Sequence, residues 1–523
     1  MWPVEKTFLL GIDAGTSVIK SVIFDLEGNE RWIASARTEV LSPVVGWAEQ
    51  DMLAVWQAVE QVVARVMAES QLPPHQIAAV GITGQGDGTW LIGRDGEPAY
   101  HAIIWLDGRG GELAERWLSE GLSQRLFALT GTLPNTSNQS VQLCWLAQHR
   151  PDILDRSQVA VHAKDWVFYK MTGQLCSDES DVSFTFFDVR RRAYSDEVFE
   201  LLGLQAWRHL MPIVRPCHQN LAPIRREVAE RMGLAPDTPV ASGPLDVTAT
   251  ALGVGALDAG DTVSILGTAG IHEMVLDRPD TDPPNVGYTM CYPLTDRWLR
   301  MVPTMTGTVS LDWFIQQFCQ EDANLARQRG VDLYHVLEEA MSQIPPGSGG
   351  IIYHPYICPG GERGPFMKPS ARAQFFGLSN AHTRHHLLRA VYEGVALSVR
   401  DCYLHMPANP TAVRLAGGGA RSPFWVQMLA DVTGTPMQLF AGSEFGARGA
   451  AINAAVAVGL FADYREAVRR MVCPASEFHP HPQRAAYYAD IHRLFQQVYR
   501  AVWDAWDELA RLQRTAEQSG RCD

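Results

Sequence analysis

Residues 8–17 read FLLGIDAGTS, an apolar run that ends at Asp13 and passes into a turn with Gly15, Thr16 and Ser17. Glycine lets the backbone approach a phosphate closely, and amide N–H groups together with hydroxyls can bind its oxygens. An aspartate at the end of the strand can hold magnesium, usually through water. The alternative is a hairpin turn that merely contains these residues, and this turn by itself favours the hairpin.

The segments around this turn indicate a β-meander rather than a strand that leads into a helix. We expect strands over residues 8–13, 18–24 and 31–36. A helix is expected over residues 52–67, with Asp51 as its N-cap and valines along one face. Strand-like and helix-like segments alternate along most of the chain, which predicts an α/β fold.

A comparable arrangement returns halfway along the chain. Strands are expected over residues 262–266 and 271–276, with Gly267 and Thr268 in the turn between them. Two such turns in equivalent places weigh more than one, because together they could bind a polyphosphate from both sides of a cleft.

This repeat of architecture predicts two similar domains that face each other. We place them at residues 1–254 and 255–523. The second is expected to end in a long amphipathic helix over residues 484–511, whose apolar positions recur at helical spacing.

Two further segments could carry chemistry. Asp246 precedes a run of helix-competent residues, so it is either a helix N-cap or a general base that removes a proton from a hydroxyl, and the two roles are compatible. Its place just before the domain boundary favours chemistry. Gly417, Gly418 and Gly419 stand between an expected strand and helix, where an adenine ring could lie against the backbone; the alternative is a connector with Ser422 as N-cap.

The segment that contains Gln85, Gly86 and Asp87 looks like a phosphate loop but continues into a strand. A carboxylate repels phosphate and accepts hydrogen bonds from hydroxyls, so this segment suits a hydroxyl-bearing ligand better. His382, His385 and His386 have the helical spacing of metal ligands, but a solvated helix start is the better interpretation.

Composition limits the class of protein. The chain has 523 residues, 46% of them hydrophobic and 20% charged, as in a folded protein with more than one domain. Its 58 acidic and 44 basic side chains give a net charge of −14, which argues against nucleic acid or an anionic membrane as a partner. Nine scattered cysteines without a CxxC pair predict reduced thiols, and no signal segment or membrane span is visible. We expect a soluble cytoplasmic protein.

These motifs resemble the FGGY carbohydrate kinases, and the resemblance runs nearly end to end. It rests on residues 11–17, 46–51, 104–107 with Arg109, 242–246, 267–270, 361–363, 375–378, 390–394 and 417–422. Two departures stand out: Gln142 replaces the lysine that usually precedes Trp145 by three residues, and Ala269 replaces a second hydroxyl in the later phosphate motif.

The resemblance implies two actin-like, ribonuclease H-like domains across a catalytic cleft, with ATP and Mg²⁺ as ligands. Asp246 would be the catalytic base, and Asp13 and Asp246 would bind the metal. Gln85, Gly86, Asp87, Asp107 and Asp246 would bind the sugar or polyol. The ATP-binding residues would be Asp13, Gly15, Thr16, Ser17, Gly267, Thr268, Gly417, Gly418, Gly419 and Ser422.

Residues 85–90, which contain the pair Gly86-Asp87, together with residues 105–107, look most like those of the erythritol kinases, and this resemblance implies a small polyol as the phosphate acceptor. Gly86 would make room and Asp87 would accept from two hydroxyls. L-xylulose or D-xylulose is the alternative substrate, and residues 135–139 are the alternative location for substrate choice. A nucleotide-switched module of the same superfamily is the rival from another class. The sequence leaves a homodimer open.

Overall fold

The computed structural model describes residues 7–519. Cys522 lies outside the described residues, and the eight other cysteines are free, as predicted. Contacts divide the chain into two compact units. The first comprises Met1–Ala259, Met274–Arg300 and Phe440–Pro474, and the second Gly260–Glu273, Met301–Leu439 and Ala475–Asp523. The single domain boundary after residue 254 stays a prediction. Two segments beyond it, Met274–Arg300 and Phe440–Pro474, pack with the first unit.

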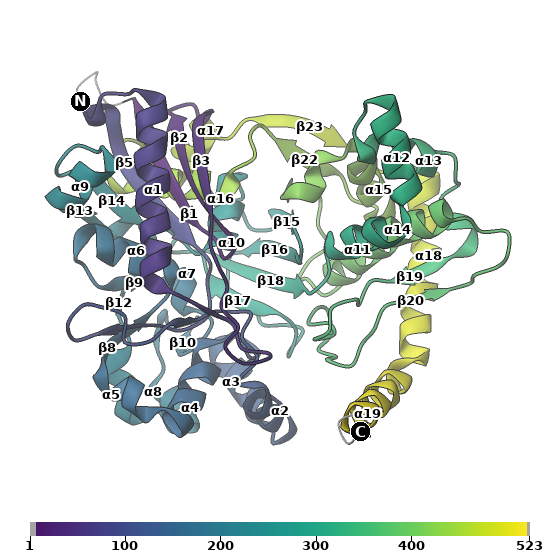
Figure 1. Ribbon diagram of the computed structural model, residues 1–523, viewed down its shortest axis with the longest axis horizontal. Helices are drawn as coiled ribbons and strands as arrows, with labels where there is room; N and C mark the ends of the chain where they lie inside the picture. The colour runs from purple at the N-terminus through teal and green to yellow at the C-terminus, as the bar shows by residue number, and fades with distance from the viewer. Residues whose placement is uncertain (1–6, 520–523) are drawn as a thin grey trace. The chain divides into compact units, whose positions relative to one another are not determined.

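The first unit is built on a six-stranded sheet with the order β13-β14-β5-β1-β2-β3 (Figure 1). Strands β1, β2 and β3 form the predicted meander, in which each strand is antiparallel to the next, and β1 and β14 both run parallel to β5. The bounds are β1 Phe8–Ala14, β2 Val18–Asp25, β3 Glu30–Arg37, β5 Ile77–Gly84, β13 Leu221–Pro223 and β14 Pro239–Ser242.

Helices cover both faces of this sheet. On one face, α1 (Met52–Ser70) begins after Asp51, which caps the helix as predicted, and packs into the same core as Leu10 and Ile12. On the other face, Leu9 packs with α16 (Phe445–Ala457). Successive side chains of β1 therefore enter two different cores, as the two-residue period of a strand requires.

Helix α16 approaches the sheet backbone directly. A Cβ at Gly11 would lie 2.2 Å from the carbonyl oxygen of Ala447, and one at Gly81 would lie 2.0 Å from that of Ala450. Glycine in the strands and alanine in the helix therefore permit this contact. A segment from the last fifth of the chain thus completes the core beneath β1.

The second large sheet has seven strands in the order β17-β18-β16-β15-β21-β22-β23. Strands β15 and β16 lie where the sequence predicts them, and β15, β21 and β22 run parallel. The order β18-β16-β15-β21-β22 repeats the order β3-β2-β1-β5-β14 of the first sheet, so the predicted repeat is confirmed. The bounds are β15 Thr262–Leu266, β16 Gly270–Leu276, β17 Tyr288–Cys291, β18 Trp298–Thr304, β21 Val413–Ala416, β22 Met437–Phe440 and β23 Pro474–Phe478.

The prediction of one long C-terminal helix is wrong, because the segment forms two helices. Helix α18 (Pro482–Ala501) ends at Val502, and α19 (Trp503–Ser519) follows. After the break, the ring of Trp503 lies 5.0 Å from that of Phe366, and Trp506 lies edge-on to Tyr356 at 5.5 Å. Aromatic packing within the second unit thus accompanies the break between the two helices. Among residues 7–519, none of the helices is long and apolar enough to cross a membrane.

Candidate active site

Asp13 lies at the carboxyl end of β1, where the strand passes into the Gly15 turn. Burial raises the pKa of this carboxyl to about 6, the nearby charge of Lys20 lowers it, and that of Glu444 raises it. Among the described residues, none donates a hydrogen bond to the Asp13 carboxylate. Gly446, in the first turn of α16, lies beside it: a Cβ there would stand 2.9 Å from Asp13 Oδ2.

Asp246 is the first residue of α10 (Asp246–Gly253), and Leu245 occupies the N-cap position. The predicted N-cap role is therefore wrong by one residue; Asp246 Oδ1 instead accepts from the N–H of Val247 at 2.7 Å. Burial and the negative charge of Asp13 raise the pKa of Asp246 to about 8. The charge of Asp13 thus destabilises the charged form of Asp246, and either a proton or a cation would relieve this repulsion.

The hydroxyl of Thr16 is used inside the protein. It donates to Gln85 Oε1 at 2.8 Å and accepts from Trp105 Nε1 at 2.8 Å. Gln85 in turn donates to Gln50 Oε1 at 2.7 Å, so the first turn is fixed to the strand that ends before Asp87. Ser17 is exposed. This geometry leaves the backbone of the turn and Ser17, rather than the Thr16 hydroxyl, to meet a phosphate.

Asp87 is half-buried and adopts a left-handed conformation with φ of 59°. Its carboxylate accepts from Ser137 Oγ at 2.9 Å and from Asn138 Nδ2 at 3.0 Å. Such a conformation is uncommon for a residue with a side chain, and hydrogen bonds to the carboxylate hold it in place. Ser137 and Asn138 lie in residues 135–139, the alternative location that the sequence offered for substrate choice.

The space beside Gly86 is occupied by protein. A Cβ at this position would lie 1.8 Å from Leu245 Cδ1 and 3.3 Å from Asp181 Oδ1. The geometry therefore favours a packing role for Gly86, next to the residue that precedes Asp246, over room for a substrate.

Asp107 is fully buried in an ion-pair network. One oxygen accepts from Arg109 Nε at 2.8 Å, and the other accepts from the N–H of Ala48 at 2.7 Å and from Arg109 Nη2 at 2.9 Å. Arg109 also bonds to Glu49 at 2.7 Å and lies over the ring of Trp47. Both Asp107 oxygens are thus in use, which favours a supporting role over the predicted direct contact with substrate.

In the second unit, the turn after β15 presents Thr268 at the surface. Its backbone is held by the next segment: the carbonyl of Gly267 accepts from the N–H of Thr308 at 2.8 Å, and that of Thr268 accepts from Gly307 at 3.0 Å. The buried Glu362 anchors this segment by accepting from the N–H of Met305 at 2.7 Å. In the sequence, Glu362 stands out only as part of the motif at residues 361–363, which predicts no role for it in supporting the turn.

Gly417, Gly418 and Gly419 follow β21, which runs parallel to β15. A Cβ at Gly417 or Gly419 would stand within 3 Å of Leu266, at the end of β15, whereas the space beside Gly418 is open. The turn after β15 and the three glycines after β21 therefore lie at the same edge of the sheet. Ser422 caps α15 (Pro423–Thr433), as predicted, and donates to Glu338 at 2.6 Å. Its hydroxyl is engaged within the protein.

Two half-buried carboxyls, Asp13 and Asp246, with glycine-containing turns in each unit, fit a phosphotransferase. The N-terminal domain of the FGGY family of carbohydrate kinases matches residues 8–253, and its C-terminal domain matches residues 262–458. The chain therefore belongs to the FGGY family of carbohydrate kinases, ATP-dependent enzymes that phosphorylate a hydroxyl of a small carbohydrate.

Curated and solved relatives agree with this assignment. An erythritol kinase of Brucella abortus (strain 2308) is 35% identical over 96% of this chain and 98% of its own length. A xylulose kinase of Escherichia coli (strain K12) is 31% identical over 94% of this chain and 99% of its own. A crystal structure of xylulose kinase from Lactobacillus acidophilus shares the fold, with a TM-score of 0.88 at 23% identity, over 96% of this chain and 99% of that one.

Proposed function

We propose that this kinase transfers the γ-phosphoryl group of ATP to a terminal hydroxyl of an erythritol-like polyol. The observation that carries the chemistry is Asp246, a half-buried carboxyl at the start of a helix, whose pKa is raised to about 8 by desolvation and by the charge of Asp13. A base that titrates near neutral pH both exists in its charged form and accepts a proton readily. The hydroxyl oxygen attacks the γ-phosphorus, its proton passes to Asp246, and the bond to ADP breaks.

Asp13 and Asp246 are the residues that would hold Mg²⁺. Two carboxylates offer the oxygen ligands that this ion prefers, and the Asp13 oxygens accept no hydrogen bond from the described residues. When bound, the ion offsets negative charge on the phosphates. The residues present therefore fit the cation.

For the nucleotide, we assign residues in each unit separately. In the first unit, Gly15 and Ser17 bind phosphate, with Thr16 contributing its backbone. In the second unit, Gly267 and Thr268 bind phosphate, and the segment from Gly417 to Ser422 binds adenosine, with the open space at Gly418 supporting close approach of a ring. We also propose a cytoplasmic location, which the free cysteines support.

The polyol is assigned to the surroundings of Asp87. Its carboxylate is oriented by Ser137 and Asn138 and stays half-exposed, so it can accept a hydrogen bond from a hydroxyl. The erythritol kinase relative supports a tetritol as substrate. Relatives that are an L-xylulose/3-keto-L-gulonate kinase and a xylulose kinase, at 29% and 31% identity, keep a ketopentose as the alternative.

The test is ADP release with purified enzyme over a panel of tetritols, pentitols, glycerol, and L- and D-xylulose. We expect the highest kcat/KM with erythritol. A wide preference for either xylulose would reject the polyol while leaving the kinase assignment intact. A second experiment tests the base with Asp246→Asn, a substitution that keeps the size of the side chain and removes its charge. It should lower kcat by about a hundredfold to ten-thousandfold with each KM little changed, the usual effect of losing a positioned base. Wild-type turnover in this variant would remove Asp246 as the base.

A further inference from the structure

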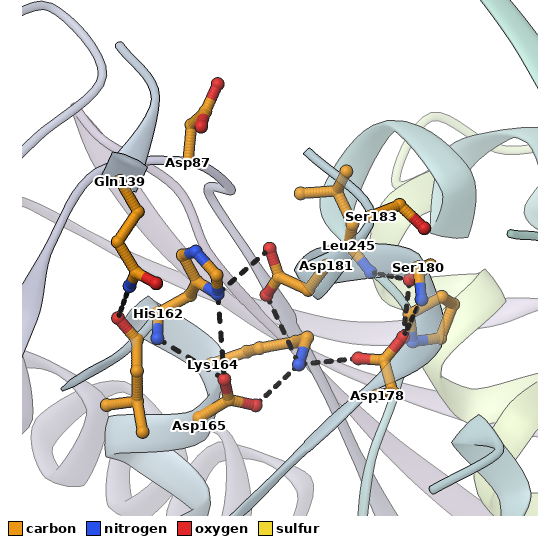
Figure 2. Close-up of polar contacts among 12 residues, drawn as sticks. Asp87, Gln139, His162, Lys164, Asp165, Asp178, Ser180, Asp181, Ser183 and Leu245 are labelled. Carbon is orange, nitrogen blue, oxygen red and sulfur yellow. Dashed lines mark hydrogen bonds and ion pairs between the residues drawn. The ribbon is translucent and has the colours of Figure 1, made fainter. Parts of the chain in front are cut away.

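The first unit buries a cluster of charged side chains that the proposed reaction does not use (Figure 2). Lys164, on α6 (Ala163–Thr172), is fully buried. Its ammonium lies 2.5 Å from Asp165 Oδ1, 2.6 Å from Asp178 Oδ2 and 3.2 Å from Asp181 Oδ2. His162 stands 3.4 Å from Asp181 through Nδ1. We call these five residues the Lys164 cluster.

The Lys164 cluster carries more negative than positive charge. Burial lowers the pKa of His162, so its ring is neutral, and three carboxyls then share one ammonium. Burial raises the pKa of Asp181 well above its ordinary value, so a proton can balance the excess. His162, Asp165 and Asp181 have a spacing that could hold a metal ion, but the Lys164 ammonium already pairs with both carboxyls.

A buried ionic cluster is weak evidence for stability, because desolvation of the charges offsets their attraction. What the cluster holds in place is therefore the more informative observation. Asp178 is the N-cap of α7 (Glu179–Val182), and its Oδ1 accepts from both the N–H and the hydroxyl of Ser180. The Ser180 Oγ in turn accepts from the N–H of Leu245 at 3.1 Å.

The direction of these bonds is fixed by the charge. Asp178, which is paired with the Lys164 ammonium, accepts the hydrogen bond from the Ser180 hydroxyl, and this leaves the oxygen lone pairs of Ser180 to accept from the N–H of Leu245. Leu245 is buried and directly precedes Asp246. On the other side, Thr83 Oγ1 donates to the carbonyl of Pro244 at 2.6 Å. The one peptide group between Pro244 and Leu245 is therefore held by a hydroxyl at its carbonyl and by another at its N–H.

We propose that Ser180, oriented by Asp178 and Lys164, is a positioning residue for the base Asp246. It fixes the backbone one residue before the base and thereby sets where the carboxylate stands relative to the reacting hydroxyl. This inference rests on the proposed role of Asp246. A shift of about 1 Å in a catalytic group can lower the rate by about a hundredfold. Loss of the hydrogen bond between Ser180 and Leu245 is therefore expected to lower kcat rather than to weaken substrate binding.

The test compares Ser180→Ala with Ser183→Ala. Ser183 is an equally buried serine at the end of α7 whose hydroxyl donates to the carbonyl of Glu179 and accepts from the N–H of Cys291 at 3.0 Å, away from Leu245. Both variants should lose similar stability in urea unfolding, since each loses buried hydrogen bonds. Ser180→Ala should lower kcat about tenfold with KM for ATP and for the polyol within about twofold, whereas Ser183→Ala should keep kcat.

The double variant Ser180→Ala/Asp246→Asn connects the effect to the base. If Ser180 acts through Asp246, its removal should change the residual turnover of Asp246→Asn by less than about twofold. An undiminished tenfold loss in that background, an equal kcat loss in Ser183→Ala, or wild-type kcat in Ser180→Ala would each overturn the inference. Wild-type turnover in Asp246→Asn alone would instead reject the proposed function, so the two failures are distinguishable.

Discussion

Gly86→Ala separates two explanations for a glycine in the substrate segment. The added Cβ would stand 1.8 Å from Leu245 Cδ1 and 3.1 Å from Leu245 Cγ, well inside contact distance. Leu245 is only 2% exposed and cannot rotate into solvent. Overpacking of this kind costs about 1–3 kcal/mol. Because Leu245 precedes Asp246, part of the adjustment should move the base, and kcat should fall about tenfold to a hundredfold.

A double-mutant cycle with Leu245→Ala isolates this contact. Leu245→Ala alone should cost about 2–5 kcal/mol, since it opens a cavity. In that background the methyl group of Gly86→Ala enters vacated space, so its further cost should be close to zero. The coupling free energy is then about 1–3 kcal/mol, measured by urea unfolding of the four proteins and compared with kcat for the same set.

The reasoning would be refuted by a Gly86→Ala cost that is equal in both backgrounds. It would equally be refuted by a variant that keeps its stability and kcat but shows a raised KM for the polyol. Either result would return Gly86 to the role that the sequence suggested, room for substrate hydroxyls.

Three other changes test separate parts of the enzyme. Thr268→Val should raise KM for ATP more than KM for the polyol in steady-state kinetics, because it removes an exposed hydroxyl from the second turn; the reverse pattern would contradict a phosphate role. Asp87→Ala should lower kcat/KM for the preferred polyol about tenfold to a hundredfold and leave KM for ATP unchanged, the expected loss of a hydrogen bond to a charged group. Equal losses over the substrate panel would make Asp87 structural. Burial raises the pKa of Glu362 from 4.5 to about 7, so the folded state holds this proton more tightly and the associated stability is lost as pH rises through that range. Glu362→Gln should therefore gain about 2 kcal/mol relative to wild type between about pH 5 and about pH 8, measured by urea unfolding, and a pH-independent difference would show that Glu362 does not titrate there.

The parts of the fold that the sequence predicted correctly are set by local physics. The strands around Asp13 and Thr268 follow from apolar runs bounded by turns, and Asp51 and Ser422 cap their helices because short polar side chains reach the first free N–H groups. The break at Val502 was missed because the apolar spacing continues across it. Aromatic partners far away in the sequence, Tyr356 and Phe366, pack against the residues that follow the break.

The sequence indicates which carboxyls are candidates for the chemistry, but the surroundings of each carboxyl come from residues elsewhere in the chain. Asp13 and Asp246 could be singled out as carboxyls in suitable places, but the rise in the pKa of each depends on burial and on a nearby negative charge, that of Glu444 for Asp13 and that of Asp13 for Asp246. Asp107 has the same residue type, yet Arg109 and the N–H of Ala48 occupy its oxygens. Residue type alone does not distinguish an available carboxylate from one already paired.

Gly86 and Lys164 show why this distinction needs the three-dimensional structure. The atom that fills the space beside Gly86 belongs to Leu245, 159 residues later in the chain. Lys164 and Asp178 are ordinary charged residues in the sequence, and the usual expectation for such residues is a solvated surface. Buried together, they instead orient the hydroxyl that meets the N–H of Leu245. Both features involve Leu245, the residue before Asp246, so we expect the position of the proposed base to depend on contacts from two distant segments. A substitution at Gly86 or in the Lys164 cluster should therefore lower kcat even though it alters no group that binds the substrate.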